Sequence, residues 1–102
     1  MADYTWAVEA ASVKPGTMQF VRLAGKSILL VNHGGTLYAW NDFCTHQKCY
    51  LHQGKLSGKV LTCPCHGAEF DVTTGVALSL PAKEPLLPYP VKVDGQDILV
   101  EI

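Results

Sequence analysis

Two short segments of this chain each carry a cysteine and a histidine at close spacing. The first is Cys44-Thr45-His46 and the second is Cys63-Pro64-Cys65-His66, with sixteen residues (47 to 62) between them. Together they offer two sulfur and two nitrogen donors. Such a set suits either a tetrahedral zinc ion or an iron–sulfur cluster in which histidines bind one iron. These residues predict a metal centre and leave open whether it is structural or carries electrons.

The composition is that of a small globular protein. The chain has 102 residues, of which 48% are hydrophobic and 17% charged, so we expect one domain spanning residues 1–102 and no extensive disorder. The net charge of −1 comes without a basic cluster, which gives no support to nucleic-acid binding. No apolar run reaches the ~18 residues of a membrane span, and the N-terminus lacks a secretion signal. We therefore expect a cytoplasmic protein without a membrane anchor, in which four cysteines are first read as metal ligands.

Short runs rich in β-branched and aromatic residues predict an all-β fold. The predicted strands lie at 5–8, 20–23, 27–32, 36–40, 60–62, 69–72, 90–94 and 98–101. Asp94-Gly95 predicts a hairpin between the last two, with Gln96 and Asp97 as residues that lengthen its loop. The prolines from Pro81 to Pro90 predict a rigid irregular connection. Since no long segment has helical periodicity, we expect an antiparallel β-sandwich or small barrel.

Each cysteine–histidine segment directly follows a predicted strand. Cys44 comes shortly after the strand at 36–40, and Cys63 comes at the end of the strand at 60–62. We therefore expect both segments to form loops at one tip of the domain, held in place by the sheet.

The two segments resemble the cluster-binding boxes of Rieske 2Fe–2S proteins. The residues that carry the resemblance are Cys44-Thr45-His46-Gln47-Lys48-Cys49 and Cys63-Pro64-Cys65-His66-Gly67. The rest of the chain, including Phe70-Asp71-Val72-Thr73-Thr74-Gly75 and residues 81–89, resembles a Rieske-type ferredoxin of the oxygenase-associated kind. The resemblance implies one 2Fe–2S cluster, with Cys44 and Cys63 on one iron and His46 and His66 on the other. Neutral imidazoles in place of two thiolates lower the negative charge, which raises the potential to the Rieske range of ~−150 to +300 mV from ~−400 mV for plant-type clusters.

Four residues in or next to the boxes bear on the kind of Rieske protein. Cys49 and Cys65 match the positions of a disulfide in respiratory-type Rieske proteins, so the resemblance implies that they are bonded to each other. Two reduced thiols are the alternative that a cytoplasmic location favours. Ala68 and Phe70 stand where respiratory-type proteins have a serine and a tyrosine whose hydroxyls donate to the cluster sulfurs. Without these donors we expect a potential in the low to middle part of the Rieske range.

Other residues are given simpler roles. Pro81 matches a third loop that covers the cluster in the family. His33 and His52 are interpreted as surface histidines. Leu51, Gln47 and Lys48 are expected to flank the tip, with apolar surface there that suits transient docking.

The resemblance implies an electron carrier that is not itself an enzyme and has no catalytic residues. It would be a monomer that takes one electron from a flavoprotein ferredoxin reductase and gives it to a terminal Rieske oxygenase. We do not expect the oxygenase itself, because it needs a second iron site with two histidines and a carboxylate and a catalytic domain, whereas only His33 and His52 remain outside the boxes of this short chain. The alternatives are a small Rieske-fold subunit of a nitrite reductase or another oxidoreductase complex and, more remotely, a zinc-binding structural module.

Overall fold

Three antiparallel sheets make up the computed structural model, which describes residues 4–44, 49–65, 67–79 and 84–102. Two sheets have the strand orders β1-β10-β9 and β2-β3-β4-β8, and a small third sheet has the order β5-β6-β7. The strands are β1 (Tyr4–Glu9), β2 (Met18–Leu23), β3 (Lys26–His33), β4 (Thr36–Asn41), β5 (Lys55–Ser57), β6 (Val60–Thr62), β7 (Glu69–Asp71), β8 (Pro88–Tyr89), β9 (Val91–Asp94) and β10 (Asp97–Glu101). Two 3-10 helices, η1 (Ala10–Ser12) and η2 (Leu51–Gln53), join them. The predicted all-β, antiparallel fold is confirmed.

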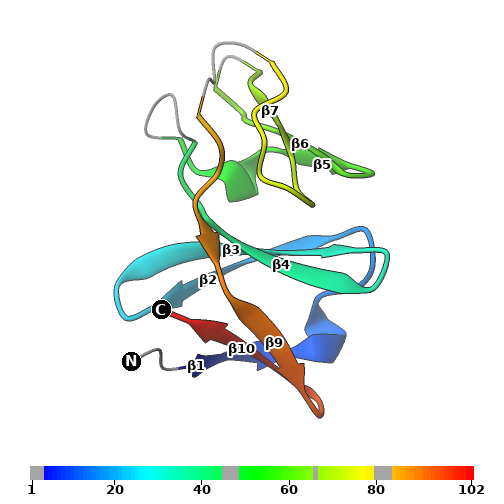
Figure 1. The fold of residues 1–102 in the computed structure, drawn as a ribbon, viewed down its shortest axis with the longest axis vertical. Coiled ribbons are helices and arrows are strands. Elements are labelled where there is room, and N and C mark those ends of the chain that lie inside the picture. The colour runs from blue at the N-terminus through cyan, green and yellow to red at the C-terminus, as the bar shows by residue number, and fades with distance from the viewer. Residues whose placement is uncertain (1–3, 45–48, 66, 80–83) are drawn as a thin grey trace.

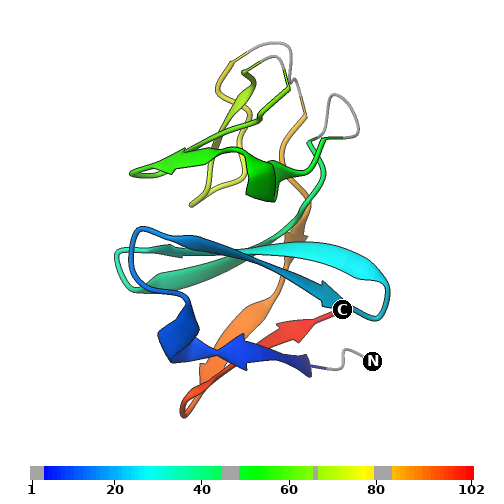
Figure 2. The ribbon, with the colours of Figure 1, turned by 180° about the vertical axis from the view of Figure 1, so that it is seen from behind.

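The sheets lie one above another along the long axis of the molecule. The sheet β5-β6-β7 and η2 lie at one end, the sheet β1-β10-β9 lies at the other, and β2, β3 and β4 run between them (Figures 1 and 2). The chain enters the small sheet after β4 and returns to the larger body at β8 and β9. The small sheet is therefore an insertion between β4 and β8, and the other two sheets form the larger body of the domain.

Both faces of β3 are covered by buried side chains. Ile28 and Leu30 belong to one buried cluster, which includes Ile98 of β10. Leu29 and Val31 belong to a second cluster, which includes Phe70 of β7. Since alternate residues of a strand point to opposite faces, the unbroken apolar run from Ile28 to Val31 fits a strand between two hydrophobic cores.

The structure corrects several predicted strand boundaries. Asp97 pairs with Asp94, so the last hairpin has a two-residue loop, with Gly95 at a positive φ of 63°, and Asp97 does not lengthen it. Part of the proline-rich connection is strand β8, which pairs with β4 at the sheet edge, where a proline without N–H is tolerated. Lys55–Ser57 forms β5 although its sequence lacks β-branched residues, because it pairs with β6.

Among the described residues, the structure contains no helix with the length and apolar character needed to cross a bilayer.

Candidate metal centre

The first cysteine segment is a loop closed by an antiparallel stem. After β4 the chain forms a bridge between Phe43 and Tyr50, and the Cys44 N–H donates to the Cys49 carbonyl at 2.9 Å. At the base of the stem the Leu51 N–H donates to the Asp42 carbonyl at 2.7 Å. We call residues 42–44 and 49–52 the stem of the first loop.

The second cysteine segment connects β6 to β7. Thr62 pairs with Glu69 in the sheet, and the next hydrogen bond runs from the Cys63 N–H to the Ala68 carbonyl at 2.7 Å. Gly67 has a φ of 70°, a left-handed conformation that a residue with a side chain adopts only under strain. Strand pairing on both sides thus fixes the place where Cys63 leaves the sheet.

The two loops bring Cys44 and Cys63 together. Both side chains are buried, with 5% and 1% of their surface exposed, in the same hydrophobic cluster. The Cys44 side chain is near enough to the Cys63 thiol to raise its pKa. Cys49 and Cys65 are joined by a disulfide, so the pairing implied by the family resemblance is present in the structure. Two thiols from separate loops therefore meet beside a covalent link between those loops.

The electrostatics of these thiols suit a metal. The pKa of Cys63 is raised to about 11, mainly by burial and also by the neighbouring Cys44, against the opposing effect of a backbone hydrogen bond involving Cys65. On its own Cys63 would stay protonated at neutral pH. A bound metal cation reverses this preference, because metal binding displaces the thiol proton. Soft sulfur donors are typical of zinc and iron–sulfur sites, so the described residues fit a cluster of the Rieske type.

Ala68 and Phe70 lie in the hydrophobic core that also contains this pair of cysteines. Both are fully buried and belong to the same hydrophobic cluster as Cys44 and Cys63. The core around the two cysteines therefore has apolar side chains at the two positions where the resemblance places hydroxyl donors in respiratory-type proteins.

Several predicted site residues lie outside the described part of the chain. These are the expected ligands His46 and His66, the loop residues Gln47 and Lys48, and Pro81. Their roles remain predictions.

Leu51 and His52 differ from their predicted places. Leu51 has no exposed surface and packs in the core with Cys44 and Cys63, so it does not form part of an apolar rim at the tip. Its position at the start of η2 turns it inward. The exposed apolar surface of the stem comes instead from Phe43 and Tyr50, with 37% and 38% exposed and ring centroids 5.0 Å apart.

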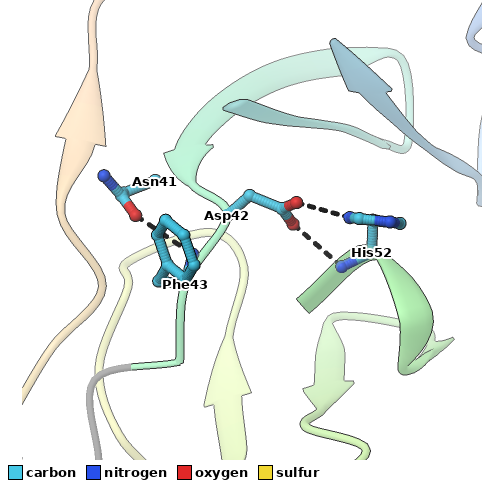
Figure 3. Close-up of polar contacts among 4 residues, drawn as sticks. All are labelled: Asn41, Asp42, Phe43 and His52. Carbon is cyan, nitrogen blue, oxygen red and sulfur yellow. Dashed lines mark hydrogen bonds and ion pairs between the residues drawn. The ribbon is translucent and has the colours of Figure 1, made fainter. Parts of the chain in front are cut away.

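His52 is not a simple surface histidine, since its side chain is only 27% exposed and pairs with the fully buried carboxylate of Asp42. Oδ1 of Asp42 accepts the His52 backbone N–H at 2.9 Å, and Oδ2 is hydrogen-bonded to Nδ1 of the ring (Figure 3). Burial raises the pKa of Asp42 above its usual range, while the hydrogen bonds from His52 act to lower it. In the sequence, His52 is recognisable as a histidine three residues after Cys49. Nothing in that spacing indicates that it pairs with Asp42, ten residues before it.

Comparison with known proteins decides the family. The family model for the Rieske [2Fe-2S] domain matches residues 3–98. The chain belongs to the Rieske 2Fe–2S family. It is 34% identical over 96 residues to the ferredoxin component of the naphthalene 1,2-dioxygenase system of Pseudomonas aeruginosa, covering 94% of this chain and 92% of that protein.

Two further comparisons specify the branch of the family. The Rieske chain is 45% identical over 76 residues to the 3-phenylpropionate/cinnamic acid dioxygenase ferredoxin subunit of Shigella boydii, covering 74% of this chain and 72% of the relative. It superposes with a TM-score of 0.90 and 33% identity on a chain from the complex of reduced oxygenase and oxidized ferredoxin in carbazole 1,9a-dioxygenase, covering 96% of this chain and 92% of that one. The chain is thus a Rieske-type ferredoxin of the oxygenase-associated kind, as the resemblance outside the two boxes indicated.

Proposed function

We propose that residues 1–102 form one Rieske domain that carries single electrons from a flavoprotein ferredoxin reductase to a terminal ring-hydroxylating oxygenase. One 2Fe–2S cluster would be held by Cys44 and Cys63 on one iron and by His46 and His66 on the other. When bound, such a cluster accepts and releases one electron. The proposal assigns no catalytic residue to this chain.

The observation that carries this proposal is the meeting of two buried thiols at the ends of two stem-closed loops. Cys44 and Cys63 leave paired backbone at points fixed by hydrogen bonds of 2.9 and 2.7 Å. Such a frame holds ligands with little rearrangement, which suits a carrier that changes charge without changing shape. The ferredoxin relatives support the same role.

The rest of the site excludes water around the two thiols. Leu51, Leu61 and Phe70 are fully buried in the cluster that contains Cys44 and Cys63. The low local dielectric strengthens the effect of every nearby charge or dipole on the electron-transfer potential. Because these neighbours are apolar, they donate no hydrogen bonds to a bound cluster, and we expect this to keep its reduction potential low.

Metal analysis tests the cofactor. The freshly purified protein should contain two irons and two sulfides per chain and be reddish-brown. A colourless protein with one zinc per chain would instead support the structural-module alternative. As a check on the ligand set, His66→Cys should lower the potential toward the all-thiolate class or abolish the centre, and an unchanged spectrum and potential would remove His66 from the set.

Reconstitution tests the role. With NADH, a flavoprotein ferredoxin reductase and a terminal oxygenase, product formation should require this protein and saturate with its concentration. We expect a monomer by size-exclusion chromatography and a cytoplasmic location on cell fractionation. If the reduced protein fails to pass its electron to any ring-hydroxylating oxygenase tested, the proposed partner class is wrong.

A further inference from the structure

The base of the first loop is held by one residue that makes three contacts. The Asp42 carbonyl accepts the Leu51 N–H at 2.7 Å, and Oδ1 accepts the His52 N–H at 2.9 Å. Oδ2 is hydrogen-bonded to Nδ1 of His52 (Figure 3). All three contacts join the outgoing limb of the stem to the returning limb.

The same residue attaches the stem to the large sheet. The Asp42 N–H donates to the Ser27 carbonyl of β3 at 3.0 Å. Cys44 follows two residues later, and its own N–H is bonded to Cys49 on the opposite limb. The position of Cys44 relative to the sheet therefore depends on how Asp42 is held.

The imidazole of His52 is itself fixed from two sides. The ring of Phe20 on β2 stacks against it with centroids 4.5 Å apart and an angle of 28° between the planes. The Tyr50 ring lies 5.3 Å away at 43°. These rings set the orientation in which Nδ1 faces the carboxylate.

Closing a loop with a buried carboxylate lowers the stability of the folded state unless the carboxylate is well paired. Its removal from water costs several kcal/mol, and a charged pair in such a place adds little or no net stability relative to apolar side chains of similar size. An apolar contact would close the stem at lower cost but would not specify direction. What the pair supplies is directional geometry, with both carboxylate oxygens engaged by one residue of the opposite limb.

We propose that His52 is a positioning residue for the metal centre. Acting through the Asp42 carboxylate, it sets the geometry of the stem and hence the placement of the Cys44 sulfur. The inference rests on the proposed function only in taking Cys44 as a cluster ligand.

Two substitutions of nearly equal shape separate hydrogen bonding from packing. His52→Asn keeps a side-chain N–H close to the place of Nδ1, whereas His52→Leu fills similar space without a donor. His33→Leu is the matched control, since His33 pairs with Thr36 at the opposite end of β3 from Ser27, about 20 Å away at the rise of a β-strand.

In the cluster-loaded protein we expect His52→Leu to lose iron to a chelator at least ~10-fold faster than wild type, the lower end of the effect of outer-shell changes. The electron paramagnetic resonance lines of the reduced protein should shift or broaden, and the Leu51 amide should exchange with deuterium faster. His52→Asn should restore all three readouts most of the way to wild type, and His33→Leu should leave them unchanged.

The proposal is wrong if His52→Leu lowers the melting temperature but leaves the resonance lines and the iron-loss rate as in wild type. It is equally wrong if His52→Asn is as defective as His52→Leu. Should the leucine variant not fold, His52→Ala, which leaves room for water beside the carboxylate, takes its place with the same expectations. Failure of the proposed function is a separate result, because it appears as a wild-type protein without a cluster or without electron transfer.

Discussion

Ala68 and Phe70 are two residues at which a single oxygen atom would change the chemistry of the site. Both are fully buried in the hydrophobic cluster that contains Cys44 and Cys63. A hydroxyl that donates to a cluster sulfur stabilises the reduced, more negative form, so Ala68→Ser and Phe70→Tyr should each raise the reduction potential. Protein-film voltammetry measures this directly, and the wild-type value should lie in the lower or middle part of the class range of ~−150 to +300 mV.

The surface supplies the control for these hydroxyls. Phe43→Tyr adds the same atom to a ring that is already 37% exposed, and it should leave the potential unchanged. If Phe70→Tyr and Phe43→Tyr shift the potential equally, the effect is not due to a hydrogen bond at the cluster. A wild-type potential near the top of the class range would also contradict the argument.

At the scale of elements, the disulfide is the covalent link between the two cysteine loops. Cys49 and Cys65 are separated by 16 positions in sequence, and closing a loop of that size stabilises the folded state by about 3 kcal/mol in the chain-entropy model. Cys49→Ser combined with Cys65→Ser should lower the free energy of unfolding by an amount of this order, as measured by urea denaturation of the loaded protein.

Intact-mass analysis after alkylation shows whether the Cys49–Cys65 disulfide forms in the isolated protein. Alkylation of the native, cluster-loaded protein should add no label at Cys49 and Cys65, and reduction beforehand should make both reactive. Two alkylated thiols without prior reduction would show that the loops are held together by hydrogen bonds and packing alone.

Gly54 is where η2 passes into β5 at close range to β6. A Cβ at this position would lie 2.0 Å from the Thr62 carbonyl oxygen and 3.2 Å from that of Leu51. Because backbone atoms cannot move aside without breaking the β5–β6 pairing, Gly54→Ala should destabilise the fold by at least the ~1–3 kcal/mol typical of overpacking. Denaturant unfolding measures the loss.

Gly58 provides the comparison for Gly54. It lies in the next turn with a φ of 59°, and a Cβ at this position would meet no atom within 4 Å, so Gly58→Ala incurs only backbone strain of about 1–2 kcal/mol. Loss of the visible cluster spectrum should accompany Gly54→Ala and not Gly58→Ala. Equal stability of wild type and Gly54→Ala would mean that β5 can shift away from Thr62.

At the scale of the whole molecule, sequence patterns predict what is local and miss what depends on loop closure. The apolar run at Ile28–Val31 and the spacing of Cys44 and Cys63 are readable because strand period and ligand chemistry act over a few residues. β5 forms because it pairs with β6, whereas the residue types of Lys55–Ser57 do not predict a strand. The Asp42–His52 pair joins residues that meet only when the first loop closes, so the sequence offered a histidine without its partner.

The charge of the molecule predicts how it meets its partners. The chain carries 8 Lys and Arg residues against 9 Asp and Glu, with a net charge of −1. Long-range steering scales with such charge, whereas the aromatic surface of Phe43 and Tyr50 on the stem is insensitive to ions. We therefore expect electron transfer to the oxygenase to change by less than about threefold between about 20 and 200 mM salt. Stopped-flow oxidation of the reduced protein gives the rate, and reduction by a neutral photoreduced flavin corrects for any effect of salt on the cluster. A fall of tenfold or more would mean that a local group of charges dominates docking despite the near-zero total.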